Sequence, residues 1–516
     1  MKVEIMDTTL RDGEQTMGIS FSPAEKETIA KFLLEEVRVD RIEIASARVS
    51  FGEMEAVKRI TKWAREKGCP QKIEILAFID GTASIDWIGK AGGQVANLLT
   101  KGSLRHVREQ LRKEPEEHLE DIRKAIRYAR SKGMTVNLYL EDWSNGMLHS
   151  SDYVFFLMDG LKDEDIKRFM LPDTLGILNP DQTADFCRIM LARYPGLHFD
   201  FHAHNDYDQA AGNVFMAVKE GIHGVHTTVN GLGERAGNVP LASVAVILND
   251  HLKAENNLNE SKLTQVSKIV ETFSGIRIPP NKPVVGENVF TQTCGVHADG
   301  DSKNNLYYND LLPERFGRNR QYALGKTSGK ANILKNLEEL GIELDPESAR
   351  KVTEKVIELG DKKEQITKED LPYILADVLN NFSSEKPVKV LNYSLTLSTG
   401  LKPIANISVE IQGQTYSESA NGDGQYNAFM NALWKIYDDL GKDHPVLVDY
   451  VVTIPPGGKT DALVSTTITW KIGNYEFKTH GLEVDQTVSA IKATEKMLNI
   501  IENVNVTEKK TKTKSY

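Results

Sequence analysis

Cysteine is scarce in this chain. The three cysteines among its 516 residues are Cys69, Cys187 and Cys294, and they form no CxxC pair. An odd number at such wide spacing excludes a disulfide framework. Because chains without disulfides are typical of reducing compartments, we expect a cytoplasmic location.

The chain also lacks an excess of positive charge and a long apolar run. Its 63 Lys and Arg residues stand against 73 Asp and Glu residues, which gives a formal net charge of −10. Nucleic-acid-binding proteins usually carry a basic face, so we expect no nucleic-acid partner. The chain holds no run of about 18 apolar residues. Its first residues enter a strand without the pattern of a signal peptide. We therefore expect no membrane span.

What the chain does have, up to about residue 250, is a regular alternation of β-rich runs and helical patterns. The expected strands are 3–7, 41–46, 72–79, 94–99, 135–141, 168–173, 198–204 and 223–229. Pro23 and Pro180 each follow a capping residue, as is typical of the first turn of a helix. Eight strand–helix units of this length predict an α/β fold, a (β/α)8 barrel over residues 1–270. An open, doubly wound sheet is the alternative.

Two histidines close the seventh expected strand, in the sequence Phe201-His202-Ala203-His204. Side chains alternate along a strand, so both imidazoles point to the same side. A second polar block, from Asp7 to Gln15, follows the first strand and contains Asp12. Since the carboxyl ends of barrel strands meet at one face, these blocks predict a divalent metal site. Either Asp7 or Asp12 would supply its carboxylate.

Further polar residues follow other strands. Asn238 ends a glycine-rich loop after the eighth strand and could add an oxygen ligand. Arg11 carries a permanent charge that could stabilise an oxyanion beside the metal, although an ion pair with Asp7 or Glu43 would also explain it.

The fifth and sixth strands also end in polar residues. Glu141 could orient a base or a ligand, and Thr174 could bind a substrate carboxylate, although each could equally serve as a cap. His106 follows the fourth strand, either at the site or at the start of a helix.

The rest of the chain has a different pattern. We expect a helical connector over 271–387, with functional loops, one of which holds His297, and helices at 329–340, 346–360 and 367–381. From 388 to 505 two βββα repeats predict a C-terminal α+β domain, and we expect residues 506–516 to be a basic tail.

Five motifs together resemble the 2-isopropylmalate, citramalate and homocitrate synthase family. They are DTTLRDGEQ at 7–15, HAHND at 202–206, GLGERAGN at 231–238, GVHADG at 295–300 and LGKTSGK at 324–330. They occur in the family's order across nearly the whole chain. The resemblance implies a (β/α)8 barrel, a helical connector and a C-terminal allosteric domain. It also implies a homodimer and an amino-acid effector, leucine or isoleucine.

The resemblance implies roles for individual residues as well. The metal ligands would be Asp12, in preference to Asp7, with His202, His204 and Asn238, and the ion would be manganese, magnesium or zinc. The catalytic residues would be Arg11, Glu141 and His297, the last acting at the site of the neighbouring subunit. Thr174 would hold the carboxylate of a 2-oxo acid. From their positions after strands, and not from the resemblance, we expect Arg48 and His106 to bind the substrate as well. The implied reaction is a Claisen-type condensation of acetyl-CoA with the oxo acid, followed by hydrolysis of the thioester.

The identity of the oxo acid is the open question. We favour 2-oxoisovalerate, and hence 2-isopropylmalate synthase, because the C-terminal domain resembles the leucine-responsive one. Citramalate synthase, acting on pyruvate, is the first alternative. Homocitrate synthase is the second, because Arg48, if turned inward, could pair with the distal carboxylate of 2-oxoglutarate.

Two other classes of protein remain. Hydroxymethylglutaryl-CoA lyases resemble the barrel but carry a cysteine within a glycine loop, whereas Cys294 here precedes Gly295. A non-catalytic amino-acid sensor would predict a broken metal set, and this set is intact.

Overall fold

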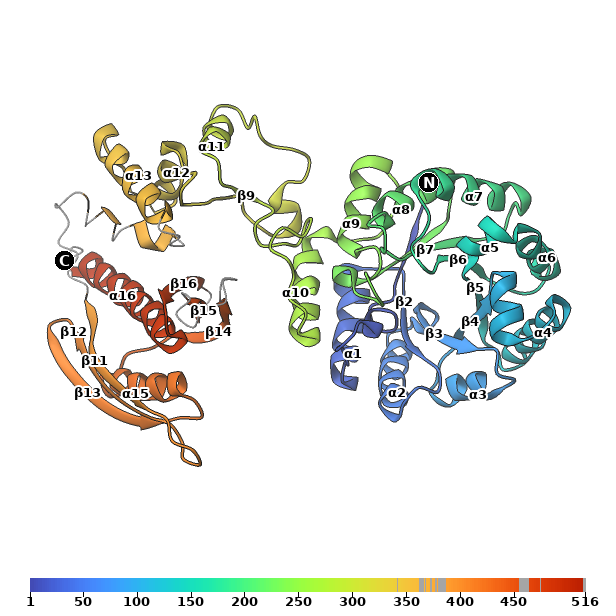
Figure 1. Cartoon of the computed structure of the whole chain (residues 1–516), viewed down its shortest axis with the longest axis horizontal. Coiled ribbons are helices and arrows are strands. Elements are labelled where there is room, and N and C mark those ends of the chain that lie inside the picture. The colour runs from blue at the N-terminus through green and yellow to red at the C-terminus, as the bar shows by residue number, and fades with distance from the viewer. Residues whose placement is uncertain are drawn as a thin grey trace. The chain divides into compact units, whose positions relative to one another are not determined.

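The computed structural model describes residues 1–340, 342–361, 366, 368–371, 374–375, 378, 387–453, 464–473 and 475–513. The chain forms two compact units (Figure 1). The first comprises Met1–Phe290 and Tyr308–Asn319, and the second comprises Thr291–Tyr307 and Arg320–Tyr516.

The first unit is built on a closed barrel of eight parallel strands in the order β1 to β8, with β8 paired to β1. The strands are β1 (Glu4–Asp7), β2 (Arg41–Ser46), β3 (Ile73–Phe78), β4 (Val95–Lys101), β5 (Thr135–Glu141), β6 (Arg168–Asp173), β7 (Phe199–Ala203) and β8 (Gly224–Thr227). All eight expected strands are present, so the predicted barrel is confirmed and the open sheet is excluded.

Helices surround the strands (Figure 1). They are α1 (Pro23–Lys31), α2 (Phe51–Glu66), α3 (Ala83–Lys90), α4 (Pro115–Ser131), α5 (Trp143–His149), α6 (Ser151–Leu161), α7 (Pro180–Arg193), α8 (Ala210–Glu220), α9 (Leu241–Val246) and α10 (Leu263–Ser274). Ser22 and Glu25 form a capping box before α1, and Asn179 and Gln182 form another before α7. Each box satisfies two backbone N–H groups, so both proline-led helices begin where the sequence predicts.

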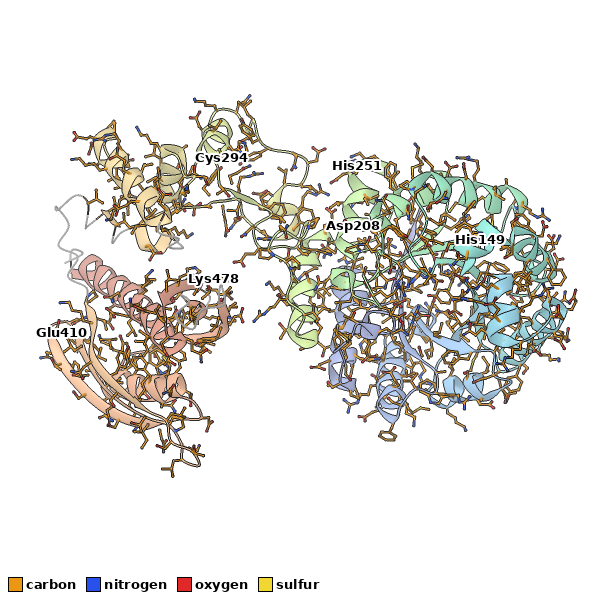
Figure 2. All side chains as sticks on the ribbon, in the orientation of Figure 1. His149, Asp208, His251, Cys294, Glu410 and Lys478 are labelled. Carbon is orange, nitrogen blue, oxygen red and sulfur yellow. The ribbon has the colours of Figure 1, made fainter. Side chains whose placement is uncertain are left out.

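Apolar side chains fill the space between strands and helices, and the side chains of the described residues are drawn in Figure 2. The inside of the barrel differs, because a charged network occupies the starts of the strands. Arg41 on β2 donates to Glu74 at 2.8 Å and to Asp200 at 2.7 Å, and all three side chains are buried. Removing one of these three side chains would leave a buried charge unpaired, which is strongly destabilising. The three residues therefore have to occur together for this end of the barrel to be stable.

Buried His118 on α4 makes stability depend on pH. Its Nε2 accepts the backbone N–H of Lys101 at 3.2 Å. Burial, reinforced by the charge of Lys113, lowers the pKa of His118 to about 4. The unfolded chain, with a histidine pKa near 6.5, therefore binds more protons than the folded chain between these two values. We expect the free energy of unfolding to fall by about 3 kcal/mol from this group as the pH drops from 6.5 to 4, and to be restored above 6.5.

Urea unfolding of the wild type and of His118→Gln across this pH range checks that expectation. Glutamine keeps an acceptor for the Lys101 N–H but does not titrate, so the difference between the two proteins should change with pH. Parallel stability curves would show that His118 is not responsible.

The second unit contains α11 (Gly295–Ser302), α12 (Lys330–Glu339), α13 (Pro346–Asp361) and the short strands β9 (Thr291–Gln292) and β10 (Gln321–Tyr322). The expected helix 367–381 lies mostly outside the described residues. Cys294, just before α11, is exposed (Figure 2). Among the described residues, no helix combines the length and the apolar character needed to cross a bilayer.

Two βββα repeats complete this unit, as the sequence predicts. The strands β11 (Val388–Thr396), β12 (Ile404–Ile411) and β13 (Gln414–Asn421) precede α15 (Gln425–Asp439). The strands β14 (Val446–Thr453), β15 (Val464–Ile472) and β16 (Tyr475–Glu483) precede α16 (Gln486–Thr513). Each repeat forms its own three-stranded antiparallel sheet. Helix α16 runs through the expected tail as far as Thr513; residues 514–516 lie outside the described part.

Candidate active site

The loop after β1, which carries Arg11 and Asp12, is bonded to β8 on one side and to a lysine of α1 on the other. The N–H of Thr8 donates to the carbonyl of Thr227 on β8 at 2.8 Å, and the N–H of Asp12 donates back to the carbonyl of Thr8 at 2.9 Å. Beneath the loop, the buried Lys26 ammonium donates to the carbonyl of Leu10 at 2.9 Å and pairs with Glu14 at 2.6 Å. The turn that carries Arg11 and Asp12 is therefore fixed to the barrel and to α1.

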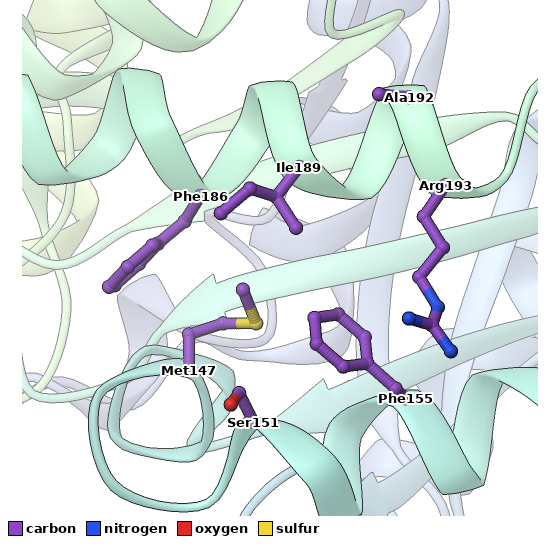
Figure 3. Close-up of a pocket in the computed structure, with 7 residues that line it drawn as sticks. All are labelled: Met147, Ser151, Phe155, Phe186, Ile189, Ala192 and Arg193. Atoms are coloured by element: carbon purple, nitrogen blue, oxygen red, sulfur yellow. The ribbon is translucent and has the colours of Figure 1, made fainter.

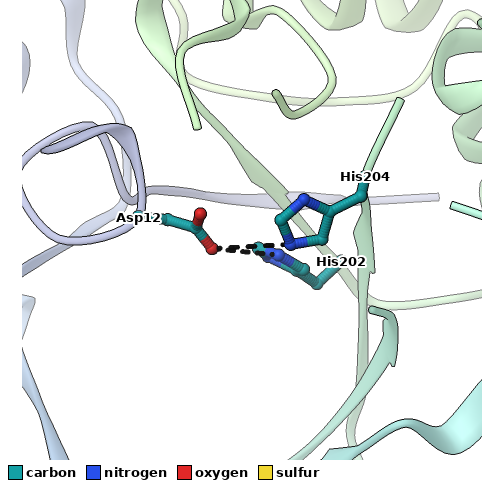
Figure 4. A group of neighbouring side chains, drawn as sticks. All are labelled: Asp12, His202 and His204. Carbon is teal, nitrogen blue, oxygen red and sulfur yellow. Dashed lines mark ion pairs between the residues drawn. The ribbon is translucent and has the colours of Figure 1, made fainter. Parts of the chain in front are cut away.

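Asp12, His202 and His204 come together at the mouth of the barrel (Figure 4). One ligand atom from each lies within 4.8 Å of the others, and all three side chains are buried. Oδ2 of Asp12 lies 3.3 Å from Nε2 of His202 and 3.8 Å from Nε2 of His204. We call these three residues the metal triad.

Asn238 adjoins the metal triad. Its Nδ2 donates to Oδ1 of Asp12 and to the carbonyl of Leu232, each at 3.1 Å. Its Oδ1 is buried and has no hydrogen-bond partner among the described residues. A buried amide oxygen without a partner is costly unless something binds it. Two imidazole nitrogens, a carboxylate and this oxygen form a donor set that fits a divalent cation.

The charge states of the metal triad also suit a cation. Burial would raise the pKa of Asp12, but the charge of Arg11 together with the contacts to His202 and His204 outweighs it and holds that pKa well below the usual range. Burial lowers the pKa of His204 to about 4 and also lowers the pKa of His202. At neutral pH the carboxylate is therefore ionised and both imidazoles are neutral, which are the forms that bind metal ions.

Arg11 lies beside the metal triad in a fixed orientation. Its Nε donates to Glu43 at 2.6 Å, its Nη1 donates to Asp12 at 2.9 Å, and its Nη2 donates to the Tyr139 hydroxyl at 3.3 Å. Glu43 is thus the structural partner that the sequence left open. Asp7 is the partner of Thr9 and Thr227 instead, and burial raises its pKa to about 6.

Three predicted residues meet around a fourth that sequence reasoning missed, Asp142. Its backbone N–H donates to the Thr174 hydroxyl at 2.8 Å, and its carboxylate lies 3.5 Å from Nε2 of His106. Glu141 precedes it and pairs with Lys101. Asp142 adopts a left-handed backbone (φ 65°), which is uncommon outside glycine, but neither its type nor its position signals this in the sequence.

Two predicted residues have other surroundings within their own units. Arg48 is half-exposed and pairs with Asp80 at 2.6 Å, so the inward turn that homocitrate synthase would need is not seen in this structure. The competition is physical, because a carboxylate within reach satisfies the guanidinium. His297 belongs to the second unit, on α11, where its ring packs on Tyr307 with centroids 4.2 Å apart.

A separate groove of about 580 Å³ lies in the outer layer between α6 and α7 (Figure 3). Met147, Phe155, Phe186 and Ile189 make it mainly apolar. Its one charged residue, Arg193, packs on the Phe155 ring and pairs with Asp159. The groove therefore holds none of the groups that carry chemistry at the mouth.

Comparison with known proteins places these features in a family. Residues 2–270 match the family model described as HMGL-like, residues 284–364 match the homocitrate synthase post-HMGL domain, and residues 365–502 match the LeuA allosteric (dimerisation) domain. The chain is 34% identical over 508 residues to the (R)-citramalate synthase of Methanocaldococcus jannaschii, covering 98% of this chain and 100% of that protein. This chain belongs to the 2-isopropylmalate, citramalate and homocitrate synthase family.

Other relatives of the synthase family bear both of the leading names. A protein of Methanopyrus kandleri, provisionally named an (R)-citramalate synthase, is 35% identical over 468 residues, which is 90% of each chain. A protein of Ignicoccus hospitalis, named as a probable 2-isopropylmalate synthase, is 36% identical over 378 residues, covering 73% of this chain and 92% of that one. The resemblance read from the five motifs is confirmed, and it leaves the substrate open.

Proposed function

We propose that the protein is an (R)-citramalate synthase, an acyltransferase that condenses acetyl-CoA with pyruvate and hydrolyses the thioester. The relatives that are named citramalate synthase and match nearly the whole chain favour this alternative. From the sequence we had preferred the hypothesis of a 2-isopropylmalate synthase, which acts on 2-oxoisovalerate. The observation that carries the proposal is an apolar wall beside Arg11.

The apolar wall is formed by Leu76 on β3, Leu99 on β4 and Tyr139 on β5. These residues belong to a small cluster inside the barrel, separate from the core between strands and helices. Leu76 and Tyr139 are buried, whereas Leu99 is only partly covered although it faces inward. A partly covered inward side chain near the end of its strand is open to the mouth, where it would contact a bound substrate.

The apolar wall limits what the oxo acid can carry. The Tyr139 hydroxyl accepts a hydrogen bond from Arg11, so the wall begins where the keto group would be bound. Three large side chains favour a methyl group over an isopropyl group at this place. The nearby cations are engaged elsewhere, Lys101 with Glu141 and Arg48 with Asp80, which disfavours the second carboxylate of 2-oxoglutarate.

The residues around the site suit the condensation. A divalent cation bound by Asp12, His202, His204 and Asn238 would polarise the keto oxygen as a Lewis acid. The Arg11 guanidinium would donate to the same oxygen and stabilise the alkoxide that forms there. The Thr174 hydroxyl already accepts the N–H of Asp142, so its own proton is left to donate to the pyruvate carboxylate.

Proton removal from the acetyl methyl group requires a base. We assign it to His297 of the neighbouring subunit, assisted by Glu141, with His106 near the substrate. Once the proton has been removed, the methyl carbon of acetyl-CoA attacks the keto carbon of pyruvate. Water then hydrolyses the thioester, which releases CoA. The match to a dimerisation domain supports a homodimer, and an amino-acid effector, leucine or isoleucine, would bind in residues 388–505.

A panel of oxo acids tests this function. Purified protein loaded with Mn²⁺ or Mg²⁺ should release CoA from acetyl-CoA with a kcat/KM for pyruvate at least about tenfold above that for 2-oxoisovalerate or 2-oxoglutarate. Free thiol released over time is the measurement. A preference for 2-oxoisovalerate would support the hypothesis of a 2-isopropylmalate synthase. Absence of CoA release with every oxo acid would refute the condensation.

The apolar wall can be tested in the same assay. Leu99→Ala should raise kcat/KM for 2-oxoisovalerate about tenfold by making room for the branched group. Leu191→Ala, which shortens a partly buried leucine of the outer layer, is the matched control and should leave the preference unchanged.

A further inference from the structure

Two motif residues have no role in the chemistry described so far. Asp206 ends the HAHND motif after β7, and Arg235 lies in the middle of the GLGERAGN motif after β8. Nε of Arg235 donates to one carboxylate oxygen of Asp206 at 2.8 Å, and Nη2 donates to the other at 3.0 Å. This is a bidentate pair, the geometry in which a guanidinium is most strongly oriented.

The same guanidinium reaches a third loop. Nη2 of Arg235 also donates to the backbone carbonyl of Thr174, after β6, at 2.7 Å. One side chain therefore ties together the loops after β6, β7 and β8. We call the pair of Arg235 and Asp206 the loop clasp.

The loops joined by the loop clasp also touch directly. Gly176, two residues after Thr174, has a φ of +58°, and a Cβ there would lie 2.8 Å from the backbone nitrogen of Asp206 and 2.9 Å from the carbonyl oxygen of His204. The N–H of Asn205 donates to the carbonyl of Gly237 at 2.9 Å. The β6 loop thus lies directly against the β7 loop, where a side chain has no room, and the β7 loop is bonded to the β8 loop.

We propose that Arg235 and Asp206 are positioning residues that place the Thr174 hydroxyl for the substrate carboxylate. The inference rests on the proposed function, in which Thr174 binds the oxo acid. Thr174 is held at two points, its hydroxyl by the Asp142 N–H and its carbonyl by Arg235. Without the loop clasp the carbonyl contact is lost, and the hydroxyl can drift from the direction that the oxo acid requires.

The expected kinetic effect is specific to one substrate. A carboxylate contact is made in the bound state and in the transition state alike, so its loss raises KM more than it lowers kcat. Arg235→Gln should raise the KM for pyruvate about 10- to 100-fold, because a misplacement of about 1 Å carries a cost of that order. The KM for acetyl-CoA and the bound metal content should stay within about twofold of wild type.

A double-mutant cycle separates positioning from general support of the fold. If Arg235 acts through Thr174, then in a Thr174→Val background Arg235→Gln should add little to the KM for pyruvate. Asp206→Asn, which keeps the shape of the side chain, should give a smaller rise in the same KM. Arg188→Gln is the matched control, because Arg188 makes a bidentate pair with Glu220 in the outer helical layer, and its KM values should not change.

The outcomes distinguish the two proposals. An unchanged pyruvate KM in Arg235→Gln, with wild type active, overturns the loop clasp and leaves the function standing. Full additivity with Thr174→Val likewise overturns it. Absence of turnover by wild type with every oxo acid overturns the proposed function, and the loop clasp falls with it.

Discussion

Replacing His202 with alanine should reduce turnover by at least about 1,000-fold and remove the bound cation while the barrel remains folded. Lewis-acid catalysis contributes several kcal/mol to the transition state, and each tenfold in rate corresponds to about 1.4 kcal/mol. His202 supplies one nitrogen of the metal triad and packs edge-on against His204 and Tyr139. Loss of the His202 ring therefore removes one ligand and also removes a packing contact that holds His204, the second ligand.

Three measurements decide this prediction. Metal content after dialysis is measured by mass spectrometry, the fold by circular dichroism, and turnover by CoA release. His149→Ala, at an exposed position on α5, is the control and should retain both metal and activity. If His202→Ala bound the cation as tightly as wild type, His202 would not be a ligand.

Replacing Arg11 with glutamine should lower kcat about 100- to 1,000-fold, the range found when one donor to a developing oxyanion is removed. Arg11 is not a metal ligand, so the variant should still bind a cation at neutral pH. Removal of its charge also removes the largest of the influences that lower the pKa of Asp12. Protons should therefore compete with the metal at a higher pH than in wild type, which a metal titration between pH 4 and 7 would show.

A second variant separates catalysis from stability. Arg11→Gln leaves the Glu43 carboxylate buried without its cation, which should destabilise the fold by about 3 kcal/mol or more. Changing Glu43 to Gln in the same protein removes that charge, so stability should recover while kcat stays low. Recovery of kcat in the double variant would mean that Arg11 is structural. Arg59→Gln, which breaks an exposed ion pair with Glu55, is the control for both readouts.

The barrel and the metal triad could be predicted because their signals are local. His202 and His204 share a strand face by spacing alone, and Asp12 lies within a motif that directly follows a strand. Each polar block follows its own strand, and the closure of eight parallel strands brings those blocks to one rim. A short stretch of sequence thus identifies both histidines and narrows the carboxylate to Asp7 or Asp12, between which the resemblance to the family decides.

The contacts that orient these residues could not be predicted in this way. Arg11 could be assigned to Glu43 or Asp7 only once the path of the first loop was known. Arg235 bonds to Asp206, which is 29 positions away in the sequence, and to Thr174, which is 61 positions away. Both contacts depend on the conformations of three loops. For Arg48 the sequence suggested a contact with the substrate that the structure does not show. Its side chain pairs with Asp80 on the next loop instead.

The apolar wall and the metal triad come from different parts of the strand ring. Leu76, Leu99 and Tyr139 lie on β3, β4 and β5, whereas the metal triad comes from the loop after β1 and from the end of β7. Under the proposed function, residues of β3 and β4 can be exchanged to change the oxo acid while the metal triad stays in place, whereas Tyr139 contacts both Arg11 and His202 and is tied to the chemistry. Directed mutagenesis of β3 and β4 is therefore the route that the proposed function suggests to a changed oxo-acid preference.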